Sequence, residues 1–494
     1  MNIVECLSTK GDTHIINIII KKQGLLMRLL SRNLLISVVA VASFSMSTVI
    51  AKTLNNEQLK TIEQLKKESL KSDLSYQILE SLTTEVGNRR LGTEGDKKAI
   101  KWAVAKMKAL GFDKVWTEEV ESPQWLRGDI EAQIISPYAH DLAAVGLGGT
   151  VGTGKKGITA PVVEFKTLAD LKAAKKGSLN GKIAFVSYRM KAAIDGSGYG
   201  PAVATRGSGA SIAAEKGALA LIMRSVGTDN NRIAHTGMMR YKKGITKIPA
   251  AALSNPDADV LVNTLKRGKK VEFHLKITAQ HFPKKMIKSA SVIGEIIGSE
   301  SPDEIVALGA HLDSWDVGTG AMDDGMGIGI VMAAGAQIAK LPQRPKRTIR
   351  VILYAGEEVG FYGTRKYMEL HKNEINKHII GAEWDFGLGK IYQIIPGVGA
   401  KALNNIHDLA QLLTPLGVAM SSKNDAIAQS DMSLLSKAGM PSINFAADGM
   451  RYFDYHHTAN DTLDKINPED YKQNTTVYTM FAYFAAQANV DFRH

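Results

Sequence analysis

The stretch EIVALGAHLD at residues 304–313 decides the fold, together with its counterpart TIRVILYAGEE at residues 348–358. Each is a short apolar run that ends in ionisable side chains, and a helix-like segment over 327–339 lies between them. Such runs predict buried strands, and strands that alternate with helices predict an α/β fold with a largely parallel sheet. Ligands of such sheets bind beyond the carboxyl ends of the strands, where both runs place their charged residues.

The same alternation extends through the rest of the chain. Further strands are predicted over 115–120, 291–297, 378–384 and 441–445, and helices over 57–72, 74–86, 96–110, 364–372, 402–413 and 470–486. This order predicts layers of helices packed on a sheet.

Composition changes between residues 130 and 285. This stretch is richer in Gly, Ala and Val and contains short strand-like runs such as KIAFV at 182–186, with a helix predicted over 212–221. It contains no cluster of residues of the metal-binding type. We therefore expect an inserted, mainly β domain over 130–285 with a non-catalytic role, flanked by the two parts of a catalytic domain at 52–129 and 286–494.

Residues 1–51 resemble an upstream extension followed by a signal peptide. Arg28 and Arg32 precede an apolar run over 34–50, and Ala51 supplies a small residue at its end. A basic flank, a short apolar stretch and a small-residue exit are the three parts of a secretory signal. We expect an exported protein, periplasmic or extracellular, with no stable membrane span after signal removal. An N-terminal membrane anchor is the alternative.

The overall composition limits the classes of function. Of the 494 residues, 45% are hydrophobic and 22% are charged, which is typical of a globular protein rather than a disordered one. The formal net charge is +12, but the basic residues are spread along the chain. A protein that binds nucleic acid gathers them into a patch or stripe. We therefore expect no nucleic-acid partner.

Five places in the second half of the chain carry residues that bind divalent metals. Each place alone has an ordinary interpretation, such as a turn acid or a surface histidine. Together they provide a histidine, a bridging acid, an acid pair, a further acid and a second histidine: His311 with Asp313, Asp323 with Asp324, Glu357 with Glu358, Asp385, and His456 with His457. Buried charges are costly unless they are paired or bind a metal. The set is sufficient for two zinc ions that share one aspartate.

At these residues the sequence resembles the co-catalytic dizinc exopeptidase family, and within it the plasma glutamate carboxypeptidase (carboxypeptidase Q) subgroup. GAHLDSWDVG at 309–318, GAMDDG at 320–325, RPKRT at 344–348 and YHH at 455–457 carry the resemblance, which covers most of the chain from about Leu74 onward. It implies a three-layer sandwich with a mixed, largely parallel eight-stranded sheet between helices, an insert similar to a protease-associated domain, small peptide substrates and a homodimer.

The resemblance also implies a role for each site residue. His311 and Asp385 would hold one zinc ion, Glu358 and His457 would hold the other, and Asp323 would bridge the two. Glu357 would be the general base, and Asp313 would orient His311.

The sequence departs from the subgroup pattern at two places. Trp384 stands beside Asp385 where the subgroup has a small residue, so we expect an altered pocket shape. The triplet 429–431 (QSD) stands where relatives carry a Thr-Asp or Ser-Asp pair. Its Asp431 is expected either to act near the site or to cap a helix.

The leading hypothesis is therefore a zinc exopeptidase acting on dipeptides or short peptides. An aminopeptidase acting through the same residues is the alternative within that class. A non-catalytic binding protein on the peptidase fold and a zinc acyltransferase of the glutaminyl-cyclase type are the alternatives from other classes. The residues that bind the peptide terminus are not evident from the sequence; Arg451, Tyr452 and Phe453 either line the pocket or form an ordinary packed loop.

Overall fold

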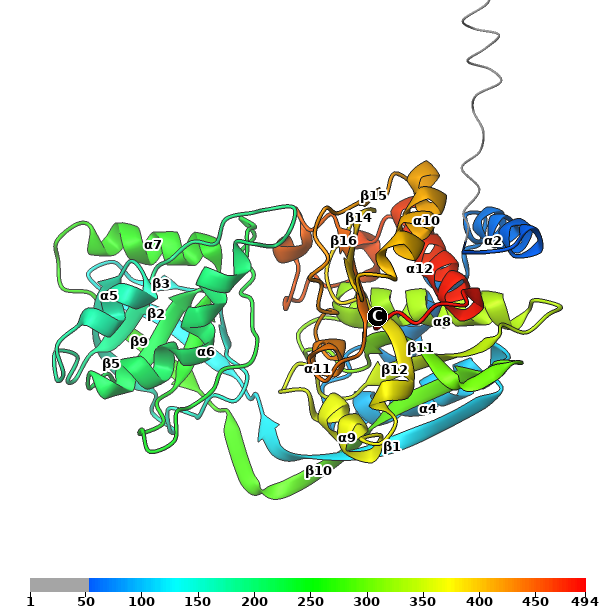
Figure 1. Cartoon of the computed structure of the whole chain (residues 1–494). Coiled ribbons are helices and arrows are strands. Elements are labelled where there is room, and N and C mark those ends of the chain that lie inside the picture. The colour runs from blue at the N-terminus through cyan, green and yellow to red at the C-terminus, as the bar shows by residue number, and fades with distance from the viewer. Residues whose placement is uncertain (1–52) are drawn as a thin grey trace, which may run out of the picture. The chain divides into compact units, whose positions relative to one another are not determined.

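The computed structural model describes residues 53–494, so the expected extension and signal peptide lie outside the described residues. This part of the chain contains two eight-stranded sheets (Figure 1). None of its helices combines the length and the apolar character needed to cross a bilayer.

The first sheet carries the strands that the opening motifs predicted. Its order is β1 (Lys114–Leu126), β10 (Gln280–Ile296), β12 (Arg347–Tyr354), β11 (Ser301–His311), β13 (His378–Glu383), β16 (Ser442–Ala447), β14 (Ile391–Gly397) and β15 (Ala419–Met420). Strands β12, β11, β13 and β16 are parallel neighbours, whereas β1, β10 and β14 join by antiparallel pairing. The expected mixed eight-stranded sheet is confirmed.

Helices cover both faces of this sheet. One side holds α2 (Asn56–Ser69), α3 (Leu74–Ser81), α4 (Glu94–Ala109), α8 (Met326–Ala339), α10 (Leu403–Leu413) and α12 (Pro468–Gln487), and the other holds α9 (Tyr362–Leu370) and α11 (Met432–Lys437). Alternate residues of β11 serve the two faces, because successive side chains of a strand point in opposite directions. Val306 and Leu308 pack with α8 and α12, and Ile305 and Ala307 pack with α9 and α11. The three expected layers result.

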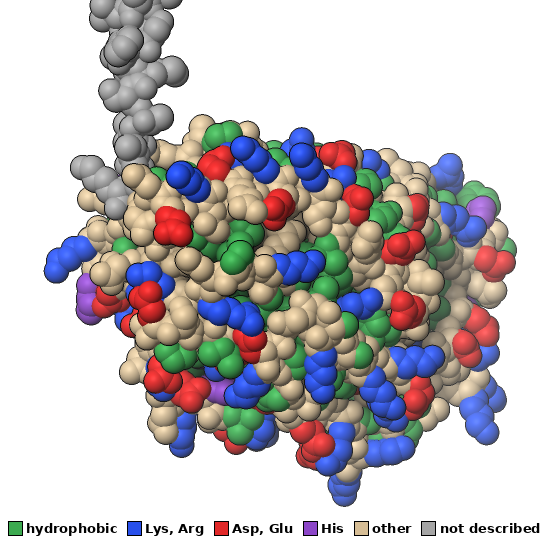
Figure 2. Space-filling view, turned by 90° about the vertical axis from the view of Figure 1, so that its right-hand side faces the viewer, with side chains coloured by type: hydrophobic (Ala, Val, Ile, Leu, Met, Phe, Trp, Pro, Cys, Tyr) green, Lys and Arg blue, Asp and Glu red, His purple; other side chains and the backbone are tan. Residues whose placement is uncertain are grey.

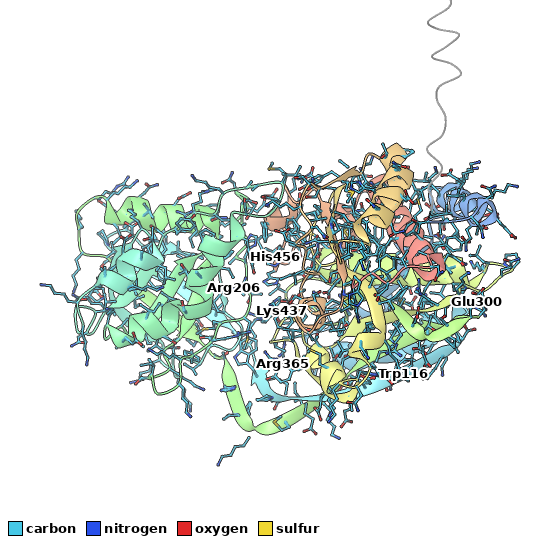
Figure 3. All side chains as sticks on the ribbon, viewed as in Figure 1. Trp116, Arg206, Glu300, Arg365, Lys437 and His456 are labelled. Atoms are coloured by element: carbon cyan, nitrogen blue, oxygen red, sulfur yellow. The ribbon has the colours of Figure 1, made fainter. Side chains whose placement is uncertain are left out.

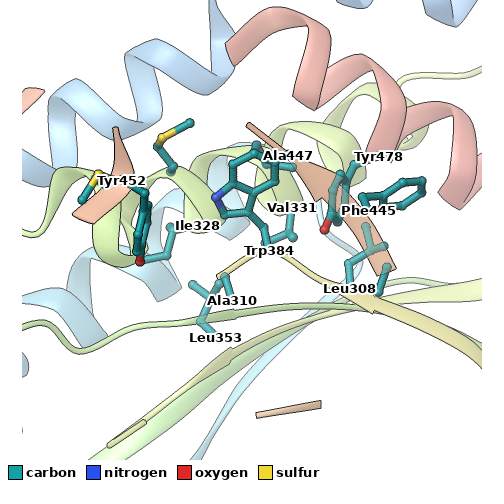
Figure 4. Packing of buried hydrophobic residues seen from close by; sticks show 14 of the residues in the cluster. Leu308, Ala310, Ile328, Val331, Leu353, Trp384, Phe445, Ala447, Tyr452 and Tyr478 are labelled. Carbon is teal, nitrogen blue, oxygen red and sulfur yellow. The ribbon is translucent and has the colours of Figure 1, made fainter. Parts of the chain in front are cut away.

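Trp384 lies in the core of the first layer rather than in a pocket (Figure 4). Its side chain is fully buried, and its ring meets that of Tyr478 edge-on, with the ring centroids 6.3 Å apart. Asp385, the next residue, points the other way, toward the carboxyl edge of the sheet. Trp384 therefore belongs to the core, and it is not among the residues that line the cavity beside Asp385.

The second sheet contains the segment that we propose as the inserted domain. Its order is β3 (His140–Asp141), β2 (Ile130–Ser136), β9 (Glu272–Ile277), β5 (Ile158–Phe165), β6 (Ile183–Val186), β7 (Ala220–Arg224), β8 (Ala250–Leu253) and β4 (Ala144–Gly146). Helices α5 (Leu168–Ala173) and α6 (Tyr199–Glu215) connect the parallel strands β5, β6 and β7, and α7 (Asn255–Leu265) follows the fourth parallel strand, β8. The segment is more helical than the mainly β domain that we expected.

Helix α6 accounts for most of this difference. We expected a helix over 212–221, but α6 ends at Glu215, and Gly217 turns the chain with a φ of +93° before β7 begins. Gly200, Gly207 and Gly209 lie inside α6, and glycine has a low helix propensity. Packing on the sheet stabilises the helix instead, a contribution that its residue pattern does not reveal.

Charged side chains of both signs are interspersed on the face shown in Figure 2. No continuous basic patch lies on that face, which agrees with the spread of lysine and arginine along the chain.

Candidate metal centre

The predicted site residues converge at the carboxyl edge of the first sheet. His311 is the last residue of β11, Glu357 and Glu358 follow β12, and Asp385 follows β13. Asp323 lies in the turn Ala321–Gly325 that leads into α8. His457 follows the short helical turn Tyr452–Asp454, beyond β16. Parallel strands bring these residues together because their carboxyl ends share one edge.

Asp323 lies between the two histidines. Its Oδ1 is 3.1 Å from Nε2 of His311, and its Oδ2 is 3.1 Å from Nε2 of His457. Each histidine also meets one further acid: Nε2 of His311 is 3.2 Å from Oδ1 of Asp385, and Nε2 of His457 is 3.0 Å from Oε2 of Glu358. The five side chains thus form two donor sets that share Asp323.

These donor sets fit zinc. Tetrahedral zinc binds nitrogen and oxygen at about 2.0–2.2 Å, which places neighbouring ligand atoms about 3.3 Å apart. The distances above are close to that value. Within residues 53–494, Oε1 of Glu358 is buried without a hydrogen-bond partner, although a buried carboxylate oxygen is normally satisfied. The chemistry and spacing of the donors therefore suit two adjacent metal ions.

The electrostatics of the cluster also favour bound cations. Burial lowers the pKa of His311, but the nearby carboxylates of Asp385 and Asp323 outweigh it and hold the pKa well above its ordinary value. Burial also lowers the pKa of His457, but the charges of Glu358 and Asp323 outweigh this effect and raise the pKa to about 9. Burial opposes ionisation of Asp323, yet the two imidazoles hold its pKa well below the ordinary range. Positive charge is strongly stabilised at this point.

His456 is a sixth group beside the cluster. Its Nε2 lies 3.5 Å from Oδ2 of Asp323, and its ring stacks on that of His457 with centroids 3.5 Å apart. Burial, and next the charge of His457, hold the pKa of His456 well below its ordinary value. His457 is the better donor by geometry, because its Nε2 approaches both Asp323 and Glu358.

Asp313 contacts His311 in a different way from the one we expected. Nδ1 of His311 donates to the backbone carbonyl of Asp313 at 2.9 Å, while the nearest carboxylate oxygen lies 3.7 Å away. That carboxylate instead accepts from the backbone N–H groups of Gly356 and Glu357 at 2.8 and 3.1 Å. Asp313 therefore links the first metal ligand to the turn that carries Glu357.

Glu357 lies in the same cavity as the metal ligands. Burial, and next the charge of Asp385, raise the pKa of its carboxyl well above the ordinary value. The hydroxyl of Ser430 donates to Oε1 of Glu357 at 2.5 Å. The adjacent acids thus have separate environments: Glu358 faces His457, and Glu357 faces the cavity.

A buried arginine fixes the loop between His311 and Asp323. Arg89 is fully buried, and its guanidinium donates to the backbone carbonyls of Leu312, Thr319 and Gly320 at 2.7, 2.7 and 2.9 Å. Its own backbone N–H donates to Ser314 Oγ at 3.0 Å. The loop that holds two of the ligands is therefore tied to the N-terminal part of the chain.

The cluster forms one wall of a cavity of about 610 Å³. The facing wall comes from helix α6 and from the loop between β7 and β8, which is a role that we did not expect for the insert. Side chains that line this wall include Tyr199, Val203, Arg206, Met238 and Arg240. Figure 3 shows Arg206 and His456 on facing elements. The segment supplies six of the residues that line the cavity and none of the predicted metal ligands.

The insert also supports the loop that carries His457. Nδ1 of His235 donates to the carbonyl of His456 at 2.7 Å, and Nε2 of His235 meets Oδ1 of Asp229 at 2.7 Å. The backbone N–H of Thr236 donates to the carbonyl of His457 at 3.0 Å. His457 has a φ of +61°, a region that non-glycine residues rarely adopt. These bonds hold the ligand in that conformation.

Three weaker expectations have clear outcomes. Asp431 is not a helix cap: it makes no capping bond to α11, and its carboxylate instead accepts from the hydroxyl of Thr364. Tyr452 and Phe453 line the cavity, whereas Arg451 is exposed and contacts Asp454 and Tyr455.

Arg206 and Arg240 were not identified from the sequence, and Ser430 was noted only as part of the triplet 429–431. No local pattern marks a role for them, because they approach the predicted ligands only through contacts between distant parts of the chain.

Comparisons with known proteins identify the family. The model of Peptidase family M28 matches residues 291–482. Carboxypeptidase Q of Xenopus laevis is 36% identical over 83% of this chain and 86% of its own length. A crystal structure of a Peptidase M28 precursor from Shewanella amazonensis is 49% identical, covering 89% of this chain and 99% of that one, with a TM-score of 0.87.

An aminopeptidase from Aneurinibacillus shares the fold at 21% identity, with a TM-score of 0.61 over 88% of this chain and 98% of that one. The chain belongs to peptidase family M28 and is a metallo-exopeptidase of that family.

Proposed function

We propose that the protein is a two-zinc exopeptidase that hydrolyses dipeptides or short peptides. The observation that carries this proposal is the position of Asp323 between two histidines. Its Oδ1 lies 3.1 Å from His311 and its Oδ2 lies 3.1 Å from His457, and each histidine also meets a further acid. His311 and Asp385 would hold one zinc ion, and His457 and Glu358 the other, with Asp323 shared. Bound zinc lowers the pKa of water and polarises a carbonyl group.

The chain's own residues complete the chemistry. Glu357 is the general base: Oε2 of its carboxylate accepts the proton of the attacking water and passes it to the leaving amine. The bond from Ser430 to Oε1 fixes the orientation of this carboxylate. Asp313 holds the backbone of Glu357 through Gly356 and Glu357 N–H. The raised pKa of Glu357 suits a group that must bind and release a proton.

The cavity supports a small substrate. Its volume of about 610 Å³ lies within the range of about 300–1,000 Å³ that is typical of small-ligand sites. The complete set of ligands and a general base in one cavity favours an enzyme over a non-catalytic binding protein. An aminopeptidase is the second candidate, because the acids on the cavity wall would also attract the α-ammonium group of a peptide.

The test is hydrolysis of free dipeptides by purified protein with measured metal content. We expect about two zinc ions per chain, loss of activity with a chelator and recovery with added zinc. One bound ion at full activity, or activity that persists without metal, would contradict the two-zinc assignment.

Export is part of the proposal and rests on the sequence pattern of residues 1–51 alone. Mass analysis of the mature N-terminus after expression with a native leader tests it. An intact leader on the cell-associated protein would favour the membrane anchor instead.

A further inference from the structure

The wall of the cavity opposite the metal centre carries two cations, Arg206 and Arg240, both from the insert. The metal-centre wall carries four acids, namely Asp323, Glu357, Glu358 and Asp385. Positive side chains thus line the cavity at a place separate from the predicted metal ligands.

The two arginines differ in their availability. Arg206 is buried, and its guanidinium donates to the hydroxyl of Tyr199 at 2.6 Å and to the carbonyl of Thr236 at 3.3 Å. It also lies 3.3 Å from Nδ1 of the ligand His457. These contacts hold Arg206 in a structural position beside the metal ligand.

Arg240 is exposed, and its side chain makes no hydrogen bond or ion pair with any residue of the described chain. Its backbone is fixed, because its N–H donates to the carbonyl of Gly207 in α6 at 3.1 Å. The guanidinium of Arg240 lies beside Gly360: its Nη2 is 3.9 Å from the position that a β-carbon at Gly360 would occupy. The guanidinium thus faces the turn that begins with Glu357 and Glu358.

We propose that Arg240 binds the free α-carboxylate of the substrate, so that the enzyme selects dipeptides and short peptides with an unblocked C-terminus. This inference rests on the proposed function. Guanidinium matches a carboxylate in shape and can bind both of its oxygens. In a dipeptide the carboxylate lies one residue beyond the scissile bond, a distance set by the spacing of about 3.8 Å between successive α-carbons.

Charge balance supports the same assignment. With two zinc ions bound, the charge of the ions would offset that of the four acids. The uncompensated positive charge in the cavity would then be that of the arginines on the facing wall, where a substrate carboxylate can meet it. Within residues 53–494 the guanidinium of Arg240 makes no hydrogen bond there. Nη1 and Nη2 of Arg206 donate to Thr236 and Tyr199, and its Nε is buried without a partner, where it is less accessible to a ligand than the exposed Arg240.

The experiment compares three substrates with the zinc-loaded full chain: a dipeptide with free termini, its C-terminal amide and its N-acetyl form. We expect the wild type to prefer the free dipeptide over the amide. Arg240→Gln should lower kcat/KM for the free dipeptide about 10- to 100-fold, mainly through KM, because it removes a charge-assisted hydrogen bond. The same variant should leave hydrolysis of the amide unchanged, and Arg240→Lys should restore part of the preference.

Arg267→Gln is the matched control, since Arg267 is exposed on the insert but does not line the cavity. It should behave as the wild type. Equal losses on the free dipeptide and the amide in Arg240→Gln would overturn the inference while leaving the proposed function intact. So would a wild type that cleaves both substrates equally well. A zinc-loaded wild type that cleaves none of the three would overturn the proposed function itself.

Discussion

The two walls of the cavity are built in different ways. The metal-centre wall uses residues that end neighbouring strands, so that His311, Glu358 and Asp385 share one sheet edge. The facing wall uses Arg206 from the middle of helix α6 and Arg240 from a loop, and both elements belong to the insert. The predicted metal ligands thus lie where the ends of parallel strands meet. The arginines lie on separate elements whose positions do not depend on that shared edge.

The difference has an electrostatic side. Asp323 and Glu358 of the metal-centre wall are buried, and buried carboxylates need nearby cations to remain ionised. Arg240 is exposed to solvent and needs no partner to remain charged. Removing a metal-centre residue should therefore affect metal content or turnover, whereas changes in the facing wall should affect substrate choice.

The largest expected effect is that of Glu357→Gln. Loss of the general base should lower kcat about 10²- to 10⁴-fold while zinc content stays near that of the wild type. Steady-state kinetics together with metal analysis measure both quantities.

The neighbouring variant Glu358→Gln is the matched comparison for Glu357→Gln. It should reduce the zinc content, since Glu358 lies 3.0 Å from His457 and Glu357 does not share that contact. Normal zinc content in Glu358→Gln together with zinc loss in Glu357→Gln would reverse the two roles.

A smaller effect is expected where the insert supports the metal centre. His235→Ala removes the donor to the carbonyl of His456 and should weaken zinc affinity about 10- to 100-fold, as changes beyond the ligands commonly do. Chelator competition measures the affinity, and excess zinc should restore most of the activity.

His274→Ala is the control for this prediction, because His274 belongs to the insert but does not line the cavity. If both histidine variants bind zinc as tightly as the wild type, the insert does not support the ligand loop.

The smallest effect concerns stability at the far end of β13, away from Asp385. Burial lowers the pKa of His378 to about 4. Its Nδ1 donates to the carbonyl of Glu374, and its Nε2 accepts from the hydroxyl of Tyr367. Between pH 6.5 and 4 the unfolded chain binds a proton that the folded protein does not, so the free energy of unfolding should fall by about 3 kcal/mol as the pH drops through this window.

His378→Gln should remove that slope, as measured by urea unfolding at several pH values. The exposed His407→Gln variant should retain it. An unchanged slope in His378→Gln would show that another group causes the acid sensitivity.

The sequence predicted the catalytic sheet well and the facing wall poorly, for a physical reason. Strand ends such as His311 and Glu357 follow apolar runs, so their position at the sheet edge follows from local pattern. Asp313 shows the limit of this reasoning: its pairing with His311 is local, but its bonds to Gly356 and Glu357 cross 43 and 44 residues of sequence. Arg240 depends wholly on such long-range packing, and no local pattern encodes it.

The pair β1 and β10 has a consequence for how this chain could have arisen. The two strands pair in antiparallel register from Lys114 with Glu295 to Leu126 with Gln280, so the chain leaves and re-enters the catalytic sheet at adjacent positions. Paired residues of neighbouring strands have α-carbons only about 4.5–5.5 Å apart. A tight turn could therefore replace everything between them without altering the sheet order. In topological terms, lengthening this one hairpin would be sufficient to add the facing wall of the cavity to the catalytic sheet.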